Sequence, residues 1–205
     1  MQRDTDDPSQ DDLSRIIAEE LRASARAKDW AAEHLSAPLA RAAEAVIAAL
    51  RGGGKVLLCG NGGSAADCQH IAAELVGQYR RRRRALAAIA LTTDTSILTA
   101  VGNDFGFEPV FARQVEALAR PGDVLIAIST SGQSPNVLAA VAAARARGCA
   151  TIGFVGRDGG PLATAVDIAL VVAVAETPRI QECHIAMGHA LCRVVEEALG
   201  GPTTE

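Results

Sequence analysis

The sequence has few aromatic side chains: Phe, Trp and Tyr make up 3% of its 205 residues, although 49% of the residues are hydrophobic. A core built from this composition must be aliphatic, and the abundance of alanine indicates closely packed helices. The length is sufficient for one α/β domain with a sizeable buried core.

Long apolar runs and a signal peptide are also missing. No stretch of eighteen apolar residues occurs, so the sequence predicts no membrane span. The N-terminus contains Asp4, Asp6, Asp7, Asp11 and Asp12, which is not a signal-peptide pattern, and a cytoplasmic location is therefore expected. The net charge of −4 gives no general reason to expect a nucleic-acid partner.

The cysteines lack the spacing of a disulfide framework or a thiolate zinc site. There are five, an odd number, and none forms a C-x-x-C pair. We therefore expect all of them to be small buried hydrophobic residues. They are Cys59, Cys68, Cys149, Cys183 and Cys192.

A run of arginines, Arg80–Arg84, follows a predicted helix. Runs of like charge are usually exposed, so we expect a solvated loop near a subunit interface. The alternative is a functional basic patch.

The chain divides into four segments. Residues 1–10 are polar and acidic and are predicted to be disordered. Residues 11–54 are predicted to form a pair of helices, Leu13–Ala27 and Pro38–Leu50, that ends at Gly52–Gly54. Residues 55–200 form the main domain, together with those helices as one structural unit, and 201–205 are a tail.

Within residues 55–200, short apolar runs alternate with helical patterns. Such runs suit the strands of a parallel sheet that is covered on both faces. The fold class predicted is a three-layer α/β/α sandwich with a five-stranded parallel sheet. The expected strands are Val56–Cys59, Leu86–Leu91, Val124–Ile128, Thr151–Val155 and Ile168–Val172, and the expected helices are Ser64–Val76, Glu108–Leu118, Pro135–Arg147, Gly159–Ala165 and Pro178–Leu199.

A glycine-rich loop, Gly60–Ser64, follows the first strand. Glycines let the backbone approach a ligand, and the helix that follows offers free N–H groups to an anion. Gly60, Gly62 and Ala65 loosely match the dinucleotide fingerprint. That fingerprint needs an acidic residue about twenty positions on, whereas Asp94 comes late, so the match is weak.

A hydroxyl-rich loop follows the strand Val124–Ile128. It contains Ser129, Thr130, Ser131 and Ser134 around Gly132, and Pro135 begins the next helix. Ser134 is placed as the N-cap and Pro135 as the first helical residue. Hydroxyl donors and helix N–H groups together suit a phosphate dianion better than an ordinary capped loop.

His70 and Glu74 are four residues apart on the helix that starts at the glycine loop, so they share one face. A surface pair is the alternative. Asp67 lies on the same face, where it would support His70.

The last helix carries two further histidines, His184 and His189, and the spacing does not distinguish between them. Gln181 precedes His189 by eight residues, a rise of about 12 Å in a helix. If both residues are helical, their side chains can meet one ion only by reaching toward it from opposite directions along the helix. Alternatively, Gln181 belongs to a turn that precedes the regular helix.

Five sequence blocks, in this order and spacing, resemble those of the phosphoheptose isomerases, a family with the sugar isomerase (SIS) fold. The resemblance covers roughly residues 35–200. The blocks are Gly60–Ser64, Gln69–Leu75, Val101–Gly106, Ser129–Ser134 and Arg179–His184, with His189 beyond.

The resemblance implies that His70, Glu74, Gln181 and His189 bind one Zn²⁺ per subunit, and that Glu74 and His189 serve as acid and base. The amide of Gln181 is a weak zinc ligand, and nitrogen and oxygen ligands accept several divalent ions. The implied substrate contacts are Asn61, Gly62, Gly63, Ser64, Glu74, Asn103, Asp104, Ser129, Thr130, Ser131, Ser134 and Gln181.

The implied reaction is aldose–ketose isomerisation of sedoheptulose 7-phosphate through a cis-enediol. The resemblance also implies a homotetramer with active sites at subunit interfaces. From the charge and the apolar pattern of the sequence, no nucleic-acid or membrane partner is expected. A non-catalytic SIS protein that binds phosphosugars or a replication initiator is the alternative; the initiator-binding relative lacks the carboxylate and the second histidine, which are present here as Glu74 and His189. A pentose- or hexose-phosphate isomerase would carry further modules for which 205 residues leave no room.

Overall fold

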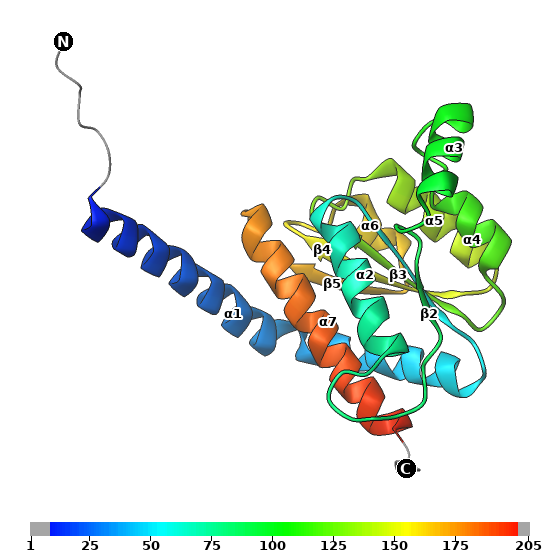
Figure 1. Cartoon of the computed structure of the whole chain (residues 1–205), viewed down its shortest axis with the longest axis horizontal. Coiled ribbons are helices and arrows are strands. Elements are labelled where there is room, and N and C mark those ends of the chain that lie inside the picture. Colours follow the sequence, from blue (N-terminus) through cyan, green and yellow to red (C-terminus); the bar gives the residue numbers. More distant parts are fainter. Residues whose placement is uncertain (1–8, 201–205) are drawn as a thin grey trace.

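A computed structural model describes residues 9–200, which form a sheet covered by helices on both faces (Figure 1). Five parallel strands lie in the order β2-β1-β3-β4-β5. The strands are β1 (Val56–Gly60), β2 (Ala88–Ala90), β3 (Val124–Ser129), β4 (Ala150–Gly156) and β5 (Ile168–Val172). The predicted fold class is therefore confirmed.

The two faces of the sheet bury separate apolar clusters. Val56 and Leu58 of β1 pack in one cluster and Leu57 and Cys59 in the other, because successive side chains of a strand point to opposite faces. The first face is covered by α1 (Gln10–Arg51), α2 (Gly63–Val76) and α7 (Thr177–Leu199). The second is covered by α4 (Ala112–Leu118), α5 (Pro135–Ala146) and α6 (Gly160–Ala165), with α3 (Thr95–Phe105) at its outer end.

The predicted N-terminal helical pair is wrong: one helix of 42 residues, α1, runs through Pro38. The residues between the two predicted helices contain no glycine, and two of them, Ala31 and Leu35, are buried in the core. Proline removes one N–H, so α1 loses a single backbone hydrogen bond there. The helix starts at Gln10 with Ser9 as its N-cap, which corrects the predicted disorder at residue 10. The rest of the predicted disordered segment and the tail lie outside the described residues.

The connection between β2 and α4 contains a helix that the sequence pattern did not predict. Asp94 caps α3 by accepting a hydrogen bond from the backbone N–H of Ile97, so the late acidic residue of the dinucleotide fingerprint has a structural role. The strand β2 is shorter than the predicted Leu86–Leu91. All five cysteines are free and buried, as predicted.

One member of the arginine run departs from the predicted solvated loop. Arg80, Arg81, Arg82 and Arg84 are exposed, but the side chain of Arg83 is only 1% exposed. Its Nε lies 3.4 Å from Oε1 of Glu196, whose side chain is fully buried. The loop is therefore anchored by an ion pair that a run of like charges does not reveal.

None of the helices between residues 9 and 200 is long and apolar enough to cross a membrane.

Candidate active site

The glycine-rich and hydroxyl-rich loops lie side by side at the carboxyl edge of the sheet. They follow β1 and β3, which are adjacent strands with Gly60 paired to Ile128. The strand order reverses between β1 and β3, the position where open α/β sheets bind ligands. The side chains of Asn61 and Asn136 join the two loops through a reciprocal pair of amide hydrogen bonds of 2.9 and 2.8 Å.

The hydroxyl-rich loop is held in shape by its own side chains. The hydroxyls of Ser129 and Ser134 lie 3.1 Å apart, and Ser129 Oγ also accepts from the backbone N–H of Gly132 at 3.1 Å. Ser134 is the N-cap of α5 and Pro135 follows it, as predicted, although Ser134 makes no side-chain cap hydrogen bond. Gly132 has φ of 66°, and a Cβ there would collide with the carbonyl oxygen of Gly159.

The glycine-rich loop meets the start of α7. A side chain at Gly63 would collide with the amide of Gln181, which lies against the first turn of α2. Gln181 is inside α7, so the interpretation that it precedes a regular helix is wrong. The helices α2, α5 and α7 each begin just after the carboxyl end of a strand. The free backbone N–H groups of their first turns therefore make this edge of the sheet favourable for an anion.

His70, Glu74 and His189 meet between α2 and α7. Nε2 of His70 lies 2.8 Å from Nε2 of His189 and 3.3 Å from Oε1 of Glu74. One ligand atom from each of the three residues lies within 4.8 Å of the others. The helices α2 and α7 run next to each other, which brings together residues far apart in the sequence (Figure 1).

The structure distinguishes the two histidines that spacing left open. His184 is fully buried beside the ring of Phe154, at a centroid distance of 5.9 Å, whereas His189 is partly exposed and faces His70. Burial lowers the pKa of His184 to about 4, with the backbone of Val155 acting in the opposite direction. His184 is therefore a neutral core residue at pH 7.

Asp67 has no hydrogen bond to His70. One of its carboxylate oxygens, Oδ2, is buried without a partner. Burial raises the pKa of Asp67, and the nearby His70 lowers it. Asp67 therefore interacts with His70 electrostatically, but it does not hold the imidazole by the hydrogen bond that the predicted support requires.

Asn103 and Asp104 lie on α3, away from the cluster between α2 and α7 (Figure 1). The amide of Asn103 donates to Asp104 Oδ1 at 2.8 Å, and both residues are exposed. Within residues 9–200, no hydrogen bond joins either of them to the other predicted site residues.

Two residues in contact with the site were missed by sequence reasoning. Asn136 is buried and orients Asn61. The ring of Tyr79 stacks on the imidazole of His189, with centroids 5.6 Å apart and 29° between the planes. A polar residue directly after Ser134-Pro135 was a signal for Asn136, whereas Tyr79 comes from a loop with no local pattern.

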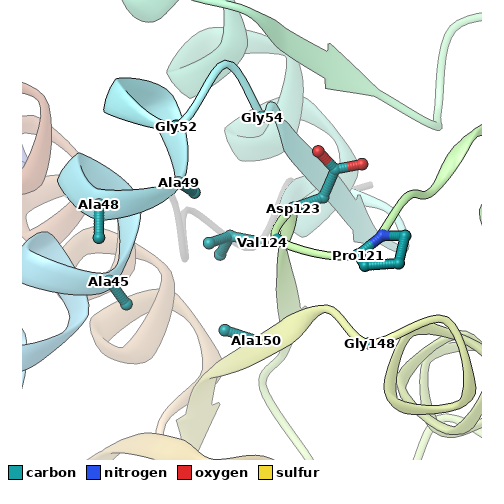
Figure 2. Close-up of a pocket in the computed structure, with 11 residues that line it drawn as sticks. Ala45, Ala48, Ala49, Gly52, Gly54, Pro121, Asp123, Val124, Gly148 and Ala150 are labelled. Atoms are coloured by element: carbon teal, nitrogen blue, oxygen red, sulfur yellow. The ribbon is translucent and has the colours of Figure 1, made fainter.

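A cavity of about 430 Å³ lies at the opposite, amino edge of the sheet (Figure 2). Its lining includes the small residues Ala45, Ala49 and Gly54. The one charged residue in that lining is Asp123, whose carboxylate is held by Lys55 and the N–H of Arg120. The lining therefore offers a substrate no charged side chain that is not already paired.

Comparisons with known proteins show the family to which this chain belongs. Residues 21–156 match the family model of the SIS domain. The phosphoheptose isomerase of Roseiflexus sp. is 55% identical over 92% of this chain and 96% of its own. That of Nitratiruptor sp. is 62% identical over 74% of this chain and 81% of its own.

Two solved structures are also similar. The phosphoheptose isomerase of Neisseria gonorrhoeae has a TM-score of 0.86 and 49% identity, covering 90% of this chain and 99% of the other. That of Francisella tularensis has a TM-score of 0.87 and 39% identity, covering 90% and 98%. The chain therefore belongs to the SIS-domain family of phosphoheptose isomerases and is an isomerase of sugar phosphates.

Proposed function

We propose that the enzyme converts D-sedoheptulose 7-phosphate to D-glycero-D-manno-heptose 7-phosphate. The observation that carries the proposal is that a carboxylate and an imidazole, those of Glu74 and His189, lie close together. Both belong to helices that start at the carboxyl edge of the sheet, where the hydroxyl-rich loop also lies. The names of the similar proteins support a heptose phosphate as the substrate.

The phosphate of the sugar is assigned to the hydroxyl-rich loop. Ser129, Thr130, Ser131 and Ser134 would donate to its oxygens, and the N-terminus of α5 favours its negative charge. The loop needs little rearrangement, because Ser129 already holds the backbone of Gly132 and faces Ser134.

The donor set between α2 and α7 fits a zinc ion. Two imidazole nitrogens and one carboxylate oxygen within 4.8 Å are the ligands of many catalytic zinc sites, which keep a further position open. We assign His70, Glu74 and His189 as ligands and Gln181 as a fourth, weaker one. A bound ion would supply a positive charge that stabilises the enediolate.

The protein residues would carry the proton transfers. Glu74 takes a proton from C1 of the ketose and returns it to C2, so that a cis-enediol forms and collapses to the aldose. His189 moves a proton between the two sugar oxygens, and no atom is gained or lost overall. The loop that holds the phosphate keeps C1 and C2 in place during both transfers.

We also propose a homotetramer with active sites at subunit interfaces. Leu13, Ile16, Ile17 and Leu21 are exposed on the part of α1 that extends from the domain (Figure 1). A second copy would cover this apolar stripe. In such an assembly, Asn103 and Asp104 need not reach the cluster of their own chain to contact a substrate.

A non-catalytic SIS protein is the second candidate function. It would hold a phosphosugar through the same hydroxyl-rich loop and would have no use for paired acid–base groups. Glu74 beside His189 favours the enzyme.

The test is incubation of the purified protein with sedoheptulose 7-phosphate, followed by NMR with and without a chelator. We expect an aldoheptose 7-phosphate to form, and Glu74→Gln and His189→Gln to lose about 10²- to 10⁴-fold in turnover while still binding substrate. Substrate binding without turnover by the native chain would favour the second candidate.

A further inference from the structure

A buried carboxylate joins the loop after α2 to α7. Glu196 accepts hydrogen bonds from the backbone N–H groups of Tyr79, Arg80 and Arg81, at 3.0, 2.9 and 3.1 Å. The guanidinium of Arg83 also faces this carboxylate, with Nε 3.4 Å from Oε1 of Glu196. Burial tends to raise the pKa of Glu196, but these N–H groups and Arg83 hold it below its ordinary value.

Arg83 uses the rest of its guanidinium to hold the end of α2. Nη2 donates to the carbonyl of Glu74 at 2.7 Å, and Nη1 to that of Leu75 at 2.8 Å. These carbonyls belong to the last turn of α2, where no helical N–H is available to them. One of them is the backbone of the proposed base, so the guanidinium is tied directly to the residue whose side chain faces His70.

Glu196 and His189 are seven residues apart on α7, about two turns, and therefore share a face. The link from Glu196 through Arg83 to Glu74 thus fixes how far α2 is displaced along α7. A slip of one helix against the other would separate His70 and Glu74 from His189.

Tyr79 adds a second restraint at the same place. Its backbone N–H is held by Glu196, and its ring stacks on the imidazole of His189. The carboxylate therefore places a flat apolar surface against the imidazole, which limits rotation of the His189 ring.

We propose that Glu196, Arg83 and Tyr79 are positioning residues of the isomerase: the buried pair sets the register of α2 against α7, and Tyr79 orients His189. The proposal rests on the proposed function in one respect: it takes from it that His70, Glu74 and His189 bind zinc and carry out the isomerisation. Neither member of the pair nor Tyr79 is assigned to touch the substrate.

The experiment compares Glu196→Gln and Tyr79→Leu with two controls. Tyr79→Phe keeps the stacked ring. Asp123→Asn breaks another ion pair with a buried carboxylate, that with Lys55 at the amino edge of the sheet, far from the cluster. Zinc affinity is measured by competition with a chromogenic chelator, and kcat and KM by the NMR assay.

We expect Glu196→Gln and Tyr79→Leu to weaken zinc binding about 10- to 100-fold, the usual effect of losing groups that orient metal ligands. Their kcat should fall with little change in KM. Tyr79→Phe and Asp123→Asn should keep the native zinc affinity and kcat.

The proposal is overturned if Tyr79→Leu matches Tyr79→Phe in both measurements, a comparison that holds even if Glu196→Gln fails to fold. It is also overturned if a folded Glu196→Gln loses no more than Asp123→Asn. If the native protein binds no zinc but Glu196→Gln and Tyr79→Leu still lose kcat, the positioning role is supported. That result would contradict only the assignment of zinc to the cluster.

Discussion

The buried imidazole of His184 should make the protein less stable in acid. In the unfolded chain a histidine binds a proton near pH 6.5, whereas in the folded protein burial lowers the pKa of His184 to about 4. Protonation therefore favours the unfolded state. The stability that depends on a neutral His184 is complete above pH 6.5 and is lost as the pH falls from 6.5 to about 4.

The size of the effect follows from the difference between the two pKa values. Each pKa unit corresponds to about 1.4 kcal/mol, so His184 should account for about 2 kcal/mol of lost stability at pH 5 and about 3 kcal/mol at pH 4. Replacing His184 by leucine removes the titrating group and keeps an apolar side chain against Phe154.

Urea unfolding followed by circular dichroism, at a fixed protein concentration and at pH 7, 6, 5 and 4, measures the difference. The free energy of unfolding of the native chain should fall more steeply with acid than that of His184→Leu, by the amounts given above. Parallel curves for the two proteins, within about 0.5 kcal/mol, would refute the assignment of His184 as a buried neutral residue.

Three further predictions concern other parts of the molecule. Gly132→Ala should raise KM for the sugar phosphate, because the φ of 66° is strained for alanine and its Cβ would displace Gly159; an unchanged KM would argue against a preformed loop. Ser129→Ala should raise KM by about 10-fold, since a hydrogen bond to a charged group contributes about 1.5 kcal/mol; an effect on kcat alone would count against phosphate binding. Asp123→Asn should lower the free energy of unfolding by about 2 kcal/mol in urea titrations and leave kcat unchanged, because it leaves Lys55 partly buried and unpaired; a loss of kcat would contradict a purely structural role.

Much of the fold follows from local patterns in the sequence. The continuous apolar runs of β1 and β3–β5 predict buried parallel strands, and the structure confirms them within a residue or two. Two local signals misled: the proline at position 38 suggested the start of a second helix, and the run of arginines suggested a fully solvated loop. In both places tertiary burial, of Leu35 and of Arg83, outweighed the local tendency.

The candidate site was only partly predictable for the same reason. The face shared by His70 and Glu74 depends on helical spacing, but the choice between His184 and His189 depends on how α7 lies on the sheet. Glu196 and Tyr79 are joined by a contact across more than a hundred residues, which no periodicity encodes.

The most direct measurement of the central claim, carbon-bound proton transfer by Glu74, is isotope exchange in D₂O. At equilibrium with sedoheptulose 7-phosphate, proton NMR should show deuterium at C2 of the aldose and at C1 of the ketose, accumulating over many turnovers and abolished by Glu74→Gln. Isomerisation that leaves both positions fully protonated, or exchange in Glu74→Gln at the native rate, would contradict the account.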